Sequence, residues 1–112
     1  MRRSSGAQVA SASARVFAAL GDEQRLRLVA RLSGEGPLSI VELSADADVT
    51  RQAVTKHLHV LEEAGIVKGS REGRRHVWSL ERKRLQKAQE HLDSIARHWD
   101  TAVDRLKAFV ED

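Results

Sequence analysis

The side chains with the clearest chemical potential lie along residues 50–64, which have the periodicity of a helix. If Val54 faces the interior, successive residues advance about 100° around the helix axis, so the opposite face can be assigned. That face and its flank would carry Arg51, Gln52, Thr55, Lys56 and His59. Amide and cationic groups of this kind pair with base edges and with phosphates. The segment therefore predicts a surface that contacts a nucleic acid.

The start of the same helix supports this hypothesis. Thr50 is expected to cap the helix, and the free backbone N–H groups of the first turn suit a phosphate. Every amphipathic helix has a polar face, so polarity alone fits an ordinary solvated surface equally well. The outward face carries no acidic residue before Glu62 and Glu63, which lie at its far end. This absence of negative charge favours a nucleic acid.

A second group of cations follows in the stretch from Gly69 to His76. The flanking residues 66–68 and 75–80 are rich in β-branched and aromatic side chains, which predicts a β-hairpin. Its long tip would run from Gly69 to Gly73. Three cationic side chains in this region would pair with phosphates or enter a narrow minor groove, namely Arg71, Arg74 and Arg75. The alternative is a hairpin whose tip is simply solvated.

The elements that position these groups can be inferred from apolar spacing and capping residues. Helices are expected at 9–20, 22–34, 39–47 and 50–64, with a short extended piece at Leu38 and a capping box at Ser39 and Glu42. Two short helices joined by a tight turn and followed by a hairpin have the order of a winged helix-turn-helix. The predicted fold is mostly α with a β-hairpin wing. It would form a single domain over 11–112, after a flexible arm at 1–10.

A long helix is expected from about Glu81 to Val110, with an unbroken apolar stripe on one side. Its members recur in alternating steps of three and four residues: Leu85, Ala88, Leu92, Ile95, Trp99, Ala102, Leu106 and Phe109. A small domain cannot bury the whole stripe, so pairing with a second copy is predicted, with Val16 of the first helix in the same interface. A two-fold dimer would present two reading helices to a palindromic DNA site. Packing on the first helix within one chain is the alternative.

Length and charge agree with a small binding protein. The chain has 112 residues and a formal net charge of +3, and residues 49–80 carry six basic and three acidic groups. With no cysteine, thiolate metal sites and disulfides are excluded. No apolar run approaches the roughly 20 residues of a membrane span, and the basic N-terminus makes a poor signal peptide. We therefore expect a cytoplasmic protein that is not an enzyme and uses no cofactor, since Gly-rich phosphate loops and catalytic triads are also missing.

Three runs of this sequence resemble the ArsR family of bacterial regulators. They are Ala19–Leu28, Gln52–Val67 and Arg71–Arg74. The resemblance covers nearly the whole chain and implies a homodimeric winged-helix repressor that leaves its operator when a signal arrives. It also implies that Thr55 and its neighbours read double-stranded DNA. His57 matches the histidine of the family's recognition-helix motif, although its place on the inner flank suits orienting the helix or touching a phosphate.

Many members of this family sense metals, and the resemblance raises that alternative here. One family site uses His and Asp at i, i+2, i+13 and i+16 of the last helix, paired across the dimer. The matching positions here are His91, Asp93, Asp104 and Lys107. A protonated lysine cannot ligate a cation, so no metal site is predicted and the signal is not identified. A metal-responsive repressor and a protein-interaction module are the alternative functions.

Overall fold

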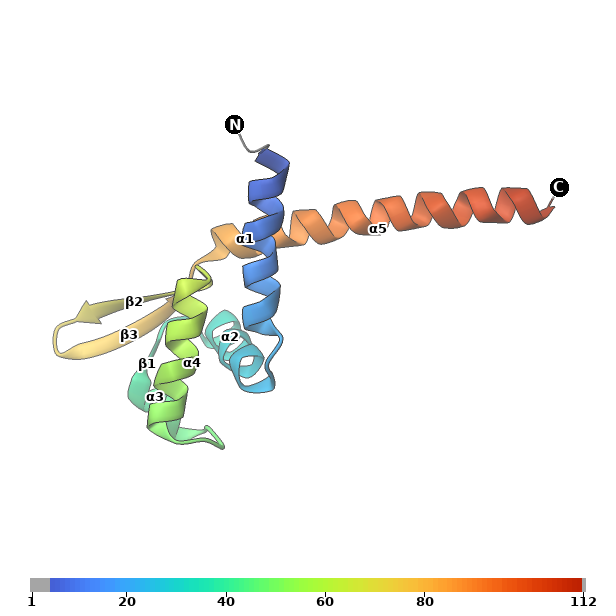
Figure 1. The fold of residues 1–112 in the computed structure, drawn as a ribbon. Coiled ribbons are helices and arrows are strands. Elements are labelled where there is room, and N and C mark those ends of the chain that lie inside the picture. Colours follow the sequence, from blue (N-terminus) through green and yellow to red (C-terminus); the bar gives the residue numbers. More distant parts are fainter. Residues whose placement is uncertain (1–4, 112) are drawn as a thin grey trace.

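The computed structural model describes the backbone of residues 5–111 and the side chains of residues 11–111. In chain order the elements are α1 (Ser5–Leu20), α2 (Glu23–Glu35), β1 (Leu38–Ser39), α3 (Ile40–Ala45), α4 (Arg51–Glu63), β2 (Val67–Glu72), β3 (Arg75–Leu80) and α5 (Arg82–Glu111). Helices α1 to α4 and the sheet form one body, from which α5 extends as a long rod (Figure 1). The principal extents are 67 × 38 × 20 Å. No helix within residues 5–111 combines the length and the apolar character needed to span a membrane.

The predicted fold class is confirmed, with a difference at the N-terminus. Helix α1 begins at Ser5, not at Val9 as its apolar spacing suggested, because small polar residues continue the helix outward. Residues 5–10, expected as part of the flexible arm, are therefore helical. Residues 1–4 of that expected arm lie outside the described residues.

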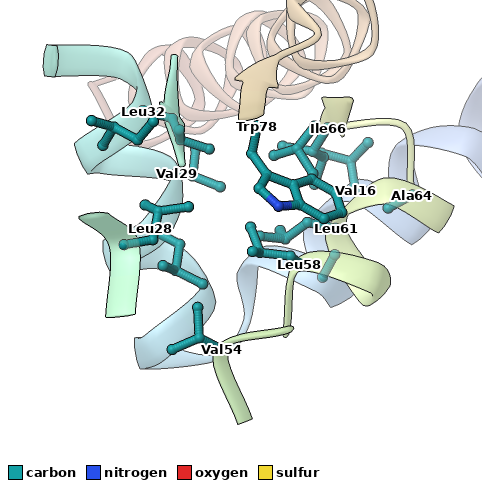
Figure 2. Close-up of a cluster of buried hydrophobic side chains, with 14 of the residues drawn as sticks. Val16, Leu28, Val29, Leu32, Val54, Leu58, Leu61, Ala64, Ile66 and Trp78 are labelled. Atoms are coloured by element: carbon teal, nitrogen blue, oxygen red, sulfur yellow. The ribbon is translucent and has the colours of Figure 1, made fainter. Parts of the chain in front are cut away.

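The core forms around the inner face of α4 and one tryptophan of the wing. Leu58 and Leu61 are completely buried, and Val54 and Trp78 are almost so. Figure 2 shows the Trp78 ring over Leu58 and Leu61, with side chains of α2 on the opposite side of the cluster. The same core takes in Val16, Ala19, Leu28, Val29, Leu32, Leu38, Leu43, Ala64, Ile66, Val67 and Ala88.

Local capping interactions fix both ends of α4. The backbone N–H of Ala53 donates to Oγ1 of Thr50 at 3.1 Å, as the sequence predicted. At the other end Gly65 has φ of 79°, a left-handed conformation that glycine adopts without strain. The backbone N–H of Ile66 donates to the Leu61 carbonyl at 2.9 Å. The chain therefore leaves α4 in a fixed direction and enters β2 directly.

The wing is an antiparallel hairpin with a short turn. The strand order is β1-β3-β2, and Trp78 of the central strand pairs with Leu38 on one side and with Gly69 on the other. The sequence predicted a long tip from Gly69 to Gly73, and this is wrong. Strand β2 continues to Glu72, which pairs with Arg75, so only residues 73 and 74 form the turn. Gly73 has φ of 65°, and a two-residue hairpin turn of type II′ carries glycine at this position.

Glu42 joins the start of α3 to the wing. The predicted capping box is present: the N–H of Glu42 donates to Ser39 Oγ at 3.2 Å, and the N–H of Ser39 donates to Glu42 Oε1 at 3.1 Å. The same carboxylate oxygen accepts a hydrogen bond from Nη2 of Arg75 at 2.6 Å. One side chain thus caps α3 and holds the first residue of strand β3, next to the hairpin turn.

Helix α5 leaves most of its apolar stripe uncovered in the single chain. Ala88 is buried and Leu85 is half-buried where α5 contacts α1. Further along, the stripe residues with large exposed side chains are Leu92, Ile95, Trp99, Leu106 and Phe109. We expected Val16 in the dimer interface, and the structure corrects this prediction. It is 1% exposed within one chain and belongs to the core, so it has no surface left to give to a partner.

Replacing Glu42 by glutamine should show how much its carboxylate contributes to stability, because that contribution depends on pH. Hydrogen bonds from Ser39, followed by the nearby Arg75, hold the pKa of Glu42 below its usual value. Because the folded pKa lies below the unfolded one, the carboxylate stabilises the fold fully above the unfolded pKa of about 4.3. This stabilisation is lost as the pH falls through the folded pKa. We expect E42Q to lower the thermal midpoint at pH 7, and this difference to shrink below a pH of about 4.

The matched control for this experiment is Glu90→Gln. It removes the same charge from an exposed residue of α5 that has no ion pair within the described part of the chain. Thermal unfolding followed by circular dichroism between pH 3 and pH 7 provides the measurement. A constant difference between wild type and E42Q over this whole range would show that the carboxylate charge contributes nothing.

Candidate nucleic-acid interface

The outward face of α4 carries the predicted set of polar side chains. Arg51, Gln52, Lys56 and His59 are exposed. Thr55 is half-buried, and its hydroxyl donates to the Arg51 carbonyl at 2.9 Å, so only its acceptor capacity remains for an outside partner. Within the described residues, neither Arg51 nor Lys56 has a carboxylate within 4.0 Å. The helix therefore offers uncompensated positive charge beside amide and imidazole groups.

A cleft between α3 and the wing brings together cations that are far apart in the sequence. Its volume is about 460 Å³, and it is lined by Ser39, Ile40, Val41, Glu42, Arg51, Arg74, Arg75 and His76. Arg51 enters from the first turn of α4, whereas Arg74 and Arg75 enter from the wing turn and strand β3. Three guanidinium groups around one groove, with a single carboxylate among them, suit a phosphate of a polyanion.

The three wing arginines have different surroundings. Arg75 is held by Glu42 at 2.6 Å, so its first role is to position the wing. Arg71 and Arg74 are exposed, and in the part of the chain that the structure describes neither forms an ion pair. The sequence predicted one function for all three cations. In the structure, Arg71 and Arg74 are the two wing arginines that no described carboxylate holds and that are available to a phosphate.

His57 turns away from the outward face of α4 and toward the start of α2. Nη1 of Arg25 lies 3.5 Å from His57 Nδ1, which lies 3.9 Å from Oδ2 of Asp22. A hydrogen bond from the Arg25 backbone N–H lowers the pKa of Asp22, so a charged carboxylate stays beside the imidazole. Nε of Arg25 also donates to the Ala19 carbonyl at 2.6 Å. In this structure His57 joins α4 to the α1–α2 corner, which fits the orienting role that the sequence left open, and its contact with DNA stays a prediction.

Two histidines and Trp78 form the contact between α4 and the wing. The His59 ring stands edge-on to Trp78, with centroids 5.9 Å apart, and the His76 ring lies over Trp78 at 4.9 Å. Strand β2 passes these rings at Gly69, where a Cβ atom would lie 2.8 Å from His76 Nε2 and 3.2 Å from the indole. The Gly69 N–H donates to Glu62 Oε2 at 3.3 Å. His59 is therefore both an exposed polar group and part of the support of the wing.

Sequence reasoning missed three contributors to this interface. The sequence predicts Glu42 as a cap but not as the partner of Arg75, and it indicates Glu62 only as an acidic residue far from the contact surface. It predicts His76 in the second strand of the hairpin, without its contact to Trp78. The hairpin register offered a local signal for His76, because residues two apart on a strand lie on one face. Nothing local in the sequence indicates the other two contacts.

Among the described residues, no three His, Asp or Glu side chains are placed to share a metal ion. His91, the first residue of the family-like set on α5, is half-buried, and its Nδ1 has no hydrogen-bond partner there. A set that is shared across a dimer would need the second copy.

Comparisons with known proteins agree with this geometry. The family described as "Helix-turn-helix domain" matches residues 13–69, from α1 into β2. The HTH-type transcriptional regulator Rv2034 of Mycobacterium tuberculosis is 38% identical over 89 residues, which are 80% of this chain and 79% of that protein.

Solved structures extend the similarity to the whole fold. An ArsR-like transcriptional regulator from Rhodococcus sp. RHA1 superposes with a TM-score of 0.78 at 32% identity, covering 88% of this chain and 92% of that one. A homodimeric winged helix-turn-helix DNA-binding domain from Mycobacterium bovis has a TM-score of 0.67 at 19% identity, over 88% and 91% of the two chains, and shares the fold. The chain therefore belongs to the ArsR family of winged helix-turn-helix transcriptional regulators, which bind DNA.

Proposed function

We propose that this regulator acts in the cytoplasm as a homodimeric repressor of its own or neighbouring genes. It would bind a palindromic operator and leave it on a signal, working by binding alone and without catalysis. The observation that carries the proposal is the cleft that joins Arg51 of α4 to Arg74 of the wing, next to an outward face that has no acidic residue before Glu62. Similar proteins that are named as transcriptional regulators support it.

The side chains divide into two roles on DNA. Gln52 and Lys56 project from the first two turns of α4, the part of a recognition helix that contacts base edges in the major groove. A glutamine pairs with adenine through two hydrogen bonds, and a lysine pairs with guanine. Arg51, Arg71 and Arg74 lie around or beyond the cleft and would contact phosphates, which fix the register of the protein on the duplex.

The uncovered stripe of α5 supports the dimer. Trp99 is 69% exposed and Phe109 is 83% exposed, in line with Leu92, Ile95 and Leu106. Contiguous apolar surface of this size on a small domain marks an interaction site. Because the stripe repeats with heptad-like spacing, a second α5 can pack on it with the same residues from both sides. Pairing would place two copies of α4 on one side of the dimer, as a palindromic operator requires.

Replacing Arg74 by alanine should weaken binding to every DNA sequence. One lost phosphate contact makes the slope of log K against log salt concentration shallower by about 1. Fluorescence anisotropy with labelled duplexes between low and moderate salt measures this slope. Arg97→Ala, which removes an exposed arginine from the side of α5 opposite the stripe, is the matched control and should leave the slope unchanged. An unaltered slope for R74A would remove the wing turn from the DNA contact.

Replacing Gln52 by alanine should instead relax sequence preference. We expect a loss of about 1–3 kcal/mol on an operator selected from a random DNA pool, with little change on scrambled DNA, because base contacts discriminate and phosphate contacts do not. Gln86→Ala on the exposed side of α5 is the control. Equal losses on both DNAs would refute base reading by this residue.

Replacing Leu92 by glutamate should convert the dimer to a monomer. A carboxylate on the stripe would be buried in the apolar interface of each copy, where it is expensive to desolvate. Sedimentation velocity at micromolar concentration gives the oligomeric state, and loss of the dimer should abolish high-affinity operator binding. Thr101→Glu lies on the opposite side of α5 and is the control. A dimer that survives L92E would rule out the stripe as its interface.

A further inference from the structure

A cavity of about 310 Å³ lies between α2 and the turn that joins α3 to α4. Its apolar walls come from Leu28, Leu43, Val49 and Val54, with Ala30 and Ala47 at the sides. Leu28 and Val54 lie at one end of the core cluster in Figure 2. The surface residues Arg27, Asp46 and Asp48 also line the cavity, so it opens to solvent. This position is separate from the DNA-facing cleft and from the stripe of α5.

The charged groups at the mouth of the cavity are already paired with one another. Arg27 forms ion pairs with Asp48 at 3.0 Å and with Glu23 at 2.7 Å. Arg31 forms ion pairs with Glu35 at 2.9 Å and with Asp46 at 3.7 Å, and it donates to the backbone carbonyl of Glu42 at 3.2 Å. A charged ligand would have to break one of these pairs. Among the residues that line the cavity, the two arginines Arg27 and Arg31 balance the two carboxylates Asp46 and Asp48, and the walls behind them are apolar.

The cavity adjoins the part of the chain that sets the position of α4. Asp48 and Val49 immediately precede the cap Thr50, while Val54 and His57 belong to the first two turns of α4. The two arginines of α2 hold residues 46–48 from the other side. A molecule wedged between α2 and this turn therefore acts on the N-terminal end of the recognition helix, which carries Gln52.

From these contacts we propose that the cavity binds an uncharged, mainly apolar small molecule, and that its binding releases DNA. The class follows from the paired charges at the mouth, since small-molecule sites are mostly apolar with few polar groups and have volumes of about 300–1,000 Å³. This inference rests on the proposed function, because the ligand would be the signal that empties the operator. Ligand and DNA would then oppose each other reciprocally.

The test uses two small uncharged probes, benzene and indole, with the full chain. Apolar cavities accept benzene, and indole adds a single N–H donor. Benzoate, which resembles benzene but carries a charge, is the control that should not bind. Two-dimensional ¹H–¹⁵N spectra should show shifts confined to α2, the end of α3 near Leu43, residues 46–50 and the start of α4. Operator affinity measured by anisotropy should fall about 5-fold or more at saturating probe.

Filling the cavity supplies the matched variants. Ala47→Met places a longer side chain in the cavity, whereas Ala45→Met extends an exposed residue of α3 that does not line it. We expect A47M to bind DNA and to lose both the probe and its effect, and A45M to behave as wild type. Ala30→Met at the mouth is a second filling variant if A47M does not fold.

The outcomes separate this inference from the proposed function. Absence of operator binding by the unliganded wild type would refute the proposed function itself. If the wild type binds its operator but neither probe binds the chain, the cavity is not a ligand site. The cavity would then be filled by a side chain of the partner copy or by water. Probe binding that leaves operator affinity unchanged, or tightens it, would also overturn the inference.

Discussion

Burial of one face of α4 is the interaction on which the rest of the structure depends. Leu58 and Leu61 are fully enclosed, which fixes the rotation of the helix about its own axis. The direction of Gln52 and Lys56 toward solvent follows directly from this burial. Because Trp78 of the wing packs over the same leucines, the wing is placed by the same core as the helix (Figure 2). The helix and the start of the wing are therefore positioned by one shared set of contacts.

Polar contacts refine what the core establishes. Glu42 connects Ser39, the N-cap of α3, to Arg75. Glu62 connects the last turn of α4 to Gly69. Arg75 compensates the charge of Glu42 beside the cleft, whereas Glu62 keeps its charge but lies at the far end of α4. The contacts are exposed, so they guide geometry more than they add stability. Their consequence is a cleft whose arginines come from two elements but open on one groove.

Helix α5 has a different relation to the core. Its start is anchored through Ala88 and Leu85 against α1, whereas the large stripe residues from Leu92 onward are exposed among the side chains that the structure describes. Exposing Trp99 and Phe109 to water is unfavourable, and burying them against a second copy would lower the free energy. In the proposed dimer, pairing would use the exposed part of α5, whereas DNA contact would use α4 and the wing.

Most of the fold was predictable because its signals are local. The capping box at Ser39, the cap at Thr50 and the glycine at position 65 all act within three or four residues, and the apolar spacing of α4 and α5 reports directly on their faces. The length of β2 and the turn at Gly73 were not predictable, since the strand register depends on Trp78 packing into the core. The pairing of Glu42 with Arg75 joins residues 33 apart, and the core position of Val16 depends on how α1 crosses the other helices. Such contacts arise only from tertiary structure.

The proposed function depends on sequence-selective DNA binding by the surface that α4 and the wing form. The most direct measurement is fluorescence anisotropy of the full chain with DNA from its own upstream region and with scrambled DNA, across a salt series. The structure predicts tight binding that favours the upstream fragment and weakens steeply with salt, because several arginines displace counterions from phosphates. No binding to either DNA at low salt would show that the surface of α4 and the wing does not bind DNA.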